Sequence, residues 1–268
     1  MSALPPICSF WHGELSFLER VCIASFIERG HDFVLYAYGD VKGLPKGARL
    51  VDAADIVPES GMFFYKGNRS AAVFADYFRL RLMEQQAGIW ADCDVYCVAP
   101  FAGLGDYAFG IERDASLATG CRAAINNAVF LCPADSALLK TLLDVFAPGA
   151  IPAGLPFWRA AEVRLRRAMG EALPVHYMQF GATGPWPLNH AVRALGLTAH
   201  ILPRDVFYPM PYGTAVDLLK PGSTLDGITG RTLGVHMWHS ALTDRGRGEM
   251  LQPQEGSFFA REIDRLGL

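Results

Sequence analysis

The segment Gly88-Ile89-Trp90-Ala91-Asp92-Cys93-Asp94-Val95-Tyr96-Cys97-Val98 has an apolar run, then two acidic residues, then a second apolar run. A short apolar run that begins after a glycine is typical of a buried strand. Asp92 and Asp94 therefore lie at the carboxyl end of a predicted strand. We expect the backbone to turn there and to present both carboxylates to one site.

The elements on either side of this segment alternate between strand and helix. Apolar runs predict strands over 6–11, 31–38, 107–112 and 127–132, a third early element over 50–57 and a last strand over 232–238. Helical spacing predicts helices over 15–30, 70–87, 134–146, 160–169 and 189–195. This order favours an α/β fold with a mostly parallel central sheet, right-handed crossovers and helices on both faces. After Leu173, frequent Gly and Pro indicate a less regular region.

Composition excludes several classes of protein. The 268 residues are 51% hydrophobic, which is enough for the core of one large α/β domain. A net charge of −3, with no basic run, argues against a nucleic-acid partner. The first residues do not resemble a secretory signal, and no apolar stretch is long enough to span a membrane. The six cysteines lie in apolar segments, as small buried side chains do. We therefore expect a cytoplasmic protein without disulfides, at most peripheral to the inner membrane.

The two carboxylates predict a metal site. Hard oxygen ligands suit Mg²⁺ or Mn²⁺, which retain open positions for the phosphate oxygens of a substrate. Asp-x-Asp alone is a weak motif, and a solvated turn is the alternative for an isolated pair. Asp76 and Arg79 are three residues apart on the predicted helix that precedes the strand, so they share a face and can form an ion pair.

The stretch from Phe74-Ala75-Asp76-Tyr77-Phe78-Arg79 to Gly88-Ile89-Trp90-Ala91-Asp92-Cys93-Asp94 resembles the signature of the DXD-type sugar transferases of glycosyltransferase family 32. The sequence departs from that signature at Ala87, where the family has the first of two glycines. The resemblance implies a GT-A fold, which is Rossmann-like. It also implies that Asp76 contacts the donor sugar, Arg79 the diphosphate or the sugar, Asp92 the ribose or the sugar, and Asp94 the metal.

The resemblance continues along most of the chain, in the family's order. The opening strand ends at Trp11, which is the candidate for stacking on the nucleotide base, and His12 follows as a second candidate. Asn126 and Asn127 match a segment that comes after the DXD motif in the family. Thr183-Gly184-Pro185 matches a turn of the same family. The C-terminal His236-Met237-Trp238-His239-Ser240 matches a His-x-Trp motif. By this resemblance the nucleotide-sugar site comprises Trp11, His12, Asp76, Arg79, Asp92, Asn126, Asn127, Gly184, Trp238 and Ser240, and the metal ligands are Asp92, Asp94 and His236.

The resemblance implies a retaining, metal-dependent glycosyltransferase that uses Mn²⁺ or Mg²⁺. It would move a sugar from a nucleotide-sugar donor, with a UDP-sugar expected, to a glycan or lipid-linked glycan in surface polysaccharide or lipopolysaccharide synthesis. Residues 1–132 would bind the donor and residues 133–268 the acceptor, in one domain. Two alternatives stay open: a degenerate protein that binds sugar nucleotides without turnover, and a phosphatase of the haloacid dehalogenase class, whose Asp-x-Asp normally lies on the first strand. The basic helix over 159–167 and the aromatic residues over 62–66 either face a lipid-linked acceptor or are simply solvated.

Overall fold

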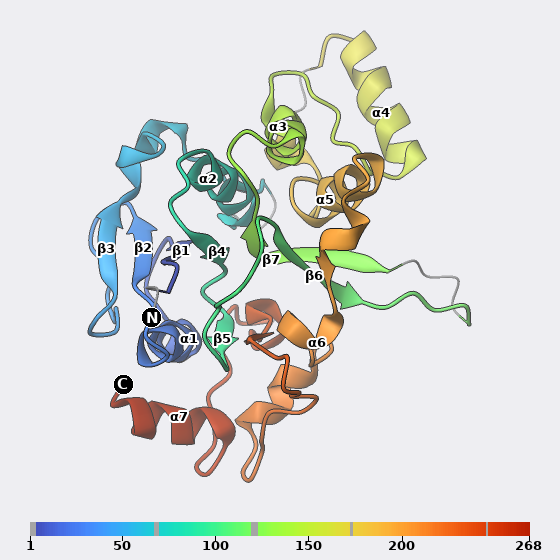
Figure 1. Ribbon diagram of the computed structural model, residues 1–268. Helices are drawn as coiled ribbons and strands as arrows, with labels where there is room; N and C mark the ends of the chain where they lie inside the picture. Colours follow the sequence, from blue (N-terminus) through green and yellow to red (C-terminus); the bar gives the residue numbers. More distant parts are fainter. Residues whose placement is uncertain (1–3, 67–69, 119–122, 172–173, 245) are drawn as a thin grey trace.

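The chain forms a mixed α/β structure around one main sheet (Figure 1). The computed structural model describes residues 4–66, 70–118, 123–171, 174–244 and 246–268. The main sheet has the strand order β3-β2-β1-β4-β7-β6-β8. Its strands are β1 (Ile7–Phe10), β2 (Phe33–Ala37), β3 (Arg49–Asp52), β4 (Ile89–Ala91), β6 (Ala108–Arg113), β7 (Ala124–Leu131) and β8 (Ile201–Leu202).

Most neighbouring strands of this sheet are parallel. The pairs β2–β3, β1–β2, β1–β4 and β6–β8 are parallel, whereas β7 runs antiparallel to both β4 and β6. The α/β fold class with a mostly parallel central sheet is thus confirmed. The predicted strand over 232–238 is shorter, because only β9 (Gly234–His236) is extended, and it pairs with β5 (Val95–Cys97) in a separate two-stranded sheet.

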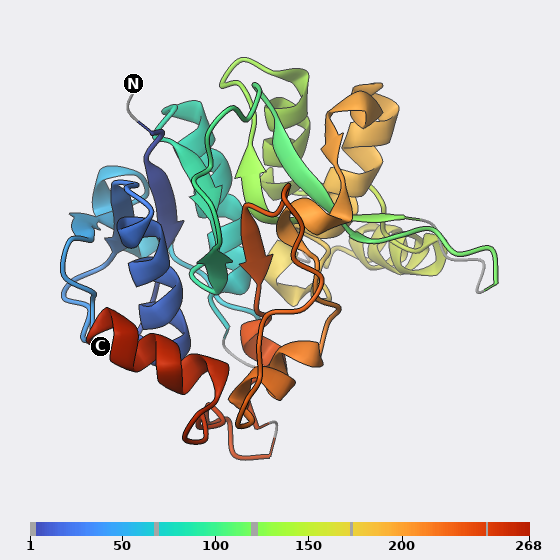
Figure 2. The same cartoon turned by 60° about the horizontal axis from the view of Figure 1, so that its bottom comes forward.

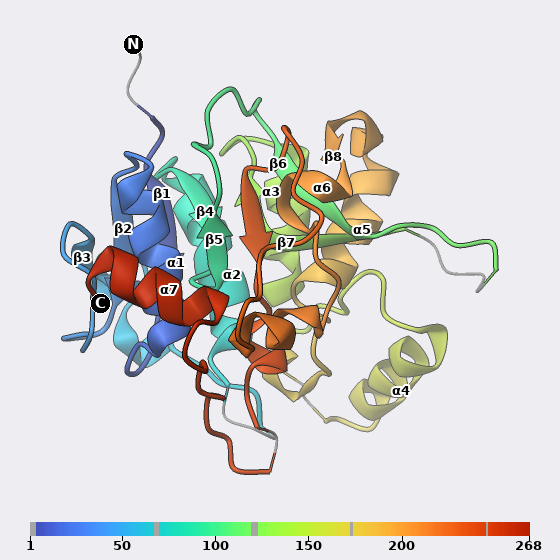
Figure 3. The ribbon, with the colours of Figure 1, turned by 90° about the horizontal axis from the view of Figure 1, so that it is seen from below.

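Helices cover both faces of the main sheet (Figures 1 and 2). The helices are α1 (Phe17–Glu28), α2 (Ala72–Glu84), α3 (Ala137–Leu143), α4 (Phe157–Ala168), α5 (Pro185–Ala194), α6 (Arg204–Phe207) and α7 (Phe258–Leu266). On one face α2, α3 and α5 pack Phe74, Leu138 and Leu188 into a cluster with Phe10 and Trp90 of the sheet. On the other face α1 packs against Ile7 and Phe33, and α7 crosses α1 (Figure 3). Short 3-10 turns lie at Ala53–Asp55, Glu59–Gly61, Asp144–Phe146, Val175–Tyr177, Leu197–His200, Thr214–Leu219 and His239–Ala241.

Local chemistry explains where the helices that frame the site begin and end. The Ser16 side chain accepts a hydrogen bond at the start of α1 while Glu19 accepts the Ser16 backbone N–H, which is a capping box. After α2 the chain enters β4 through Gly88, with φ 143°. A Cβ atom on Gly88 would lie 2.4 Å from the Pro6 carbonyl oxygen, so only glycine fits there. Ala87 does not carry this constraint.

The described cysteines, Cys8, Cys22, Cys93, Cys97 and Cys132, are buried and free. Burial raises the pKa of the Cys8, Cys97 and Cys132 thiols to about 12, so these side chains pack as small neutral groups. Cys121 lies outside the described residues. Among the described helices, none combines the length and the apolar character that a membrane crossing requires.

Candidate functional site

Asp92 and Asp94 lie in a tight turn between β4 and β5. The Val95 N–H donates to the Asp92 carbonyl oxygen at 3.0 Å and closes the turn. The Asp92 N–H donates to the Ala128 carbonyl oxygen at 2.7 Å and ties the turn to β7. The turn follows the carboxyl end of β4, next to β1, whose other neighbour is β2. Ligands of open α/β sheets bind at such a point, where the strand order reverses.

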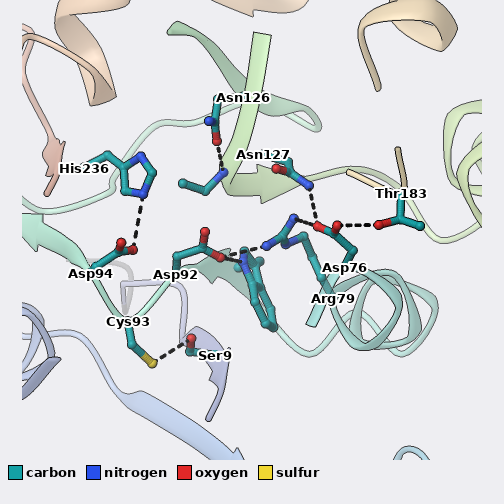
Figure 4. Close-up of polar contacts among 12 residues, drawn as sticks. Ser9, Asp76, Arg79, Asp92, Cys93, Asp94, Asn126, Asn127, Thr183 and His236 are labelled. Atoms are coloured by element: carbon teal, nitrogen blue, oxygen red, sulfur yellow. Dashed lines mark hydrogen bonds and ion pairs between the residues drawn. The ribbon is translucent and has the colours of Figure 1, made fainter. Parts of the chain in front are cut away.

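The second sheet brings His236 to the same turn. Val95 of β5 pairs with His236 of β9, and the Met237 N–H donates to the Asp94 carbonyl oxygen at 2.8 Å. One ligand atom from each of Asp92, Asp94 and His236 lies within 4.8 Å of the other two. Figure 4 shows the His236 ring above Asp94, with Nε2 3.3 Å from Oδ1. Residues 142 positions apart in the chain, Asp94 and His236, therefore belong to one compact group.

The charged groups in this cluster shift one another's pKa values. Burial alone would raise the pKa of Asp94, but the His236 ring and the His239 backbone N–H, 2.7 Å from Oδ2, lower it to about 2. Burial would lower the pKa of His236, and the charges of Asp94 and Asp92 raise it instead. Asp94 is thus an anion throughout the neutral range, stabilised by its neighbours.

The donor set fits a hard divalent cation. Two carboxylates and one imidazole are ligands that Mn²⁺ accepts, and carboxylate oxygen is the preferred ligand of Mg²⁺. Within the described part of the chain, Asp92 Oδ2 receives no hydrogen bond and the buried Nδ1 of His236 has no partner. With three protein ligands, a cation held here would keep coordination positions open for other oxygens.

Arg79 joins Asp92 to Asp76. Its Nη1 donates to Asp76 Oδ1 at 3.0 Å and its Nη2 to Asp92 Oδ1 at 2.7 Å. The guanidinium lies over the Trp90 ring, 4.7 Å from the ring centroid, and the indole Nε1 of Trp90 also donates to Asp92 Oδ1. The Arg79 side chain is only 4% exposed, so in this structure it holds the two carboxylates in place and does not face an open surface. Burial raises the pKa of Asp92, and the charge of Arg79 opposes that shift.

Asp76 is the centre of a second group of contacts (Figure 4). Its Oδ1 accepts a hydrogen bond from Asn127 Nδ2 at 3.0 Å, and its Oδ2 accepts one from Thr183 Oγ1 at 2.8 Å. A Cβ atom on Gly184 would lie 2.7 and 2.8 Å from the two Asp76 carboxylate oxygens, so the glycine lets the chain approach Asp76 closely. These residues line one small pocket beside α2 and α5.

Of the other predicted site residues, Trp238 lies beside His236 and Trp11 lies farther away, beside His239. Trp238, directly after β9, has its ring 4.0 Å from that of His236, and its buried Nε1 has no partner among the described residues. Its φ of 59° is uncommon for a bulky residue and indicates that surrounding contacts impose the conformation. Trp11 lies half-buried at the end of β1, with its ring 5.9 Å from that of His239.

His12, Ser240 and Asn126 do not join the carboxylate groups. His12 is exposed with its ring 5.4 Å from that of Phe64, and Ser240 is exposed on the turn after Trp238. The Asn126 side chain donates a hydrogen bond to Glu112 and accepts one from the Ala128 N–H, so its polar atoms bond to residues of β6 and β7. Of the two asparagines, it is Asn127 that reaches Asp76.

The sequence interpretation missed Glu19 and His239. Glu19 is completely buried on α1, and its Oε1 lies 2.6 Å from Nδ1 of His239. Burial lowers the pKa of His239, and the hydrogen bond and charge of Glu19 reverse that shift and raise it. The same His239 donates its backbone N–H to Asp94, so the pair ties α1 to the turn that carries Asp92 and Asp94. The signal in the sequence was the capping-box spacing of Ser16 and Glu19.

The comparisons with known proteins add little to this geometry. No protein-family model matches the chain, and no curated protein matches it. Among solved structures, the chain is similar to the PaToxG glycosyltransferase, with 14% identity over 73% of each chain and a TM-score of 0.43. It is also similar to the WbbM bifunctional glycosyltransferase, with 11% identity over 99% of this chain and 50% of that chain and a TM-score of 0.39. Membership of glycosyltransferase family 32 stays a prediction.

Proposed function

We propose that this chain is a metal-dependent glycosyltransferase of the GT-A type that moves a sugar from a nucleotide-sugar donor, expected to be a UDP-sugar, to a glycan or lipid-linked glycan. One observation carries the proposal: Asp92, Asp94 and His236 converge at the carboxyl end of β4, beside the buried group of Asp76 and Arg79. The first group has the chemistry to hold a cation against a diphosphate. The second offers polar atoms for the hydroxyl groups of a sugar.

The reaction breaks the bond between the anomeric carbon and a phosphate oxygen and forms a bond to the acceptor oxygen. The bonding electrons leave with the diphosphate, which also takes the acceptor's proton, so the reaction needs no protein base. We propose retention of configuration by front-face displacement, as the family resemblance implies. A cation held by Asp92, Asp94 and His236 would supply Lewis-acid stabilisation of the charge that grows on the diphosphate.

The remaining residues position the reactants. Arg79 holds Asp76 and Asp92 in place through its two hydrogen bonds, and fixed side chains hold donor and acceptor in near-attack geometry. Asp76 retains acceptor capacity beyond its bonds to Asn127 and Thr183, so it can receive a hydrogen bond from a sugar hydroxyl. The Nε1 of Trp238 is a buried donor that a phosphate or sugar oxygen would satisfy.

Sugar-nucleotide hydrolysis tests the proposal, because transferases release the nucleoside diphosphate slowly to water when no acceptor is present. We expect the chain to release UDP from at least one of UDP-glucose, UDP-galactose and their N-acetyl forms with Mn²⁺, and not with a chelator. Asp94→Asn should lower the rate at least about a hundredfold, because several kcal/mol of charge stabilisation depend on the cation. The matched control is Asp217→Asn, an exposed aspartate paired with Lys220, which should leave the rate unchanged.

Each contrary result has a distinct meaning. UDP release that is insensitive to the chelator and to Asp94→Asn contradicts the proposal. Tight binding of a nucleotide sugar with no release from any donor or transfer to any acceptor supports the degenerate binding protein. Phosphate release from an aryl phosphate, with no reaction on nucleotide sugars, supports the phosphatase alternative. A product of inverted configuration by proton NMR removes the front-face mechanism alone.

A further inference from the structure

Helix α4 presents an apolar stripe to solvent. Val163 is the buried residue of this helix. The large apolar side chains Phe157, Trp158, Leu165 and Met169, at its start, along it and at its end, are 86%, 54%, 62% and 61% exposed. At 100° per residue, Trp158, Leu165 and Met169 fall on one line along the helix, about 140° away from Val163. Figure 3 shows α4 standing away from the main sheet.

Basic residues border this stripe. The helix contains Arg159, Arg164, Arg166 and Arg167 against one acid, Glu162, so its net charge is +3 in a chain whose net charge is −3. Glu162 is paired with Arg159 and, at 3.2 Å, with Arg166. By helical geometry Arg164 lies beside Phe157 on one border of the stripe, and Arg159 and Arg166 lie on the other. Arginines therefore lie on both sides of the stripe, and Glu162 lies between the stripe and its partners Arg159 and Arg166.

A neighbouring segment extends the exposed aromatic surface. Nε of Arg159 donates to Oε1 of Gln179 at 3.3 Å, which ties the start of α4 to this segment. Tyr177 and Phe180, on either side of Gln179, are also exposed. Exposed Phe and Trp in such numbers are unusual on a surface without a binding role.

We propose that α4 docks the protein on an anionic lipid bilayer, with its apolar stripe in the interface and Arg159, Arg164 and Arg166 on the lipid phosphates. An apolar face with Trp, Phe and Leu beside a basic face is the composition of helices that lie in the plane of a membrane surface. Guanidinium groups beside the stripe complement the negative headgroups of such a bilayer. This inference holds independently of the reaction that the site catalyses.

Vesicle co-sedimentation of the full chain tests the proposal. We expect the wild type to sediment with phosphatidylcholine vesicles that contain phosphatidylglycerol, and not with phosphatidylcholine alone, and we expect salt to weaken binding. The double variant Trp158→Ser/Leu165→Ser should bind at least about tenfold more weakly, since two inserted apolar side chains are lost. Arg164→Glu should weaken binding to a similar degree, because it reverses one charge at the lipid surface.

Leu117→Ser is the matched control, because Leu117 is fully exposed and lies outside α4. It should bind like the wild type, and all variants should keep the wild-type melting temperature because they change exposed side chains. No sedimentation with anionic vesicles, or equal binding by the double variant, overturns the proposal. Light scattering provides a further outcome. If the wild type is a dimer, the double variant is a monomer and neither protein binds vesicles, the stripe serves self-association instead.

Discussion

Removing the charge of Arg79 while keeping an apolar stem, as in Arg79→Met, should strongly destabilise the fold. Arg79 donates to both Asp76 and Asp92, and it is 4% exposed. Breaking a buried ion pair by removing one partner costs about 3–5 kcal/mol, because the remaining charge stays buried without compensation. An unfolding entropy of about 2.1 cal/mol/K per residue gives about 0.56 kcal/mol/K for 268 residues. The melting temperature should therefore fall by about 5–9 °C.

Arg81→Met is the control on the same helix. Arg81 pairs with Glu84 at 2.7 Å, but its side chain is 39% exposed, and surface pairs contribute about 0–1 kcal/mol. Differential scanning calorimetry should show a loss below about 2 °C for Arg81→Met. The deficit of Arg79→Met should shrink in acid, since burial raises the pKa of Asp92 and protonation of Asp92 removes one uncompensated charge. Equal losses in the two variants at neutral pH would refute the argument that the buried Arg79 compensates two half-buried carboxylates.

Three further changes probe the site and the fold. Gly184→Ala would place a methyl group 2.7 Å from the Asp76 carboxylate, and we expect calorimetric affinity for the donor to fall at least about tenfold. His31 is hydrogen-bonded to backbone at both ring nitrogens, and burial lowers its pKa from 6.5. As pH falls below 6.5, His31 is protonated in the unfolded chain before it is protonated in the folded one, which favours unfolding. In urea melts the free energy of unfolding of the wild type should therefore fall by up to about 1.4 kcal/mol per pH unit more than that of His31→Gln. Glu19→Gln removes the charge beside His239, so the NMR-measured pKa of His239 should fall; an unchanged value would show that Glu19 does not hold that ring.

The order of elements around the site was predictable because each depends on local patterns. The apolar run after Gly88 and the helical spacing before it indicate β4 and α2, and both are present. Strand direction is not a local property: nothing in the residues of β7 distinguishes a parallel from an antiparallel neighbour. Helix α7 was missed because Gly and Pro punctuate the preceding chain, although Phe258 and Phe259 anchor it in the core.

Within the site, the limits of prediction follow from sequence distance and from strand geometry. Glu19 is a residue type expected on the surface, and its partner His239 lies 220 positions away, so burial of the pair could not be read from either segment. Strand geometry predicts that only one of Asn126 and Asn127 reaches Asp76, because successive residues of a strand point to opposite faces. It does not predict which of the two it is. Convergence of Asp92, Asp94 and His236 required the pairing of β5 with β9.

Diffraction from crystals grown with UDP and MnCl₂, recorded at the manganese absorption edge, tests the central claim most directly. We predict one anomalous peak in contact with Asp92, Asp94 and His236 and with the oxygens of the diphosphate. UDP bound elsewhere on the molecule, or UDP bound at this turn with no manganese beside the three side chains, would contradict the assignment.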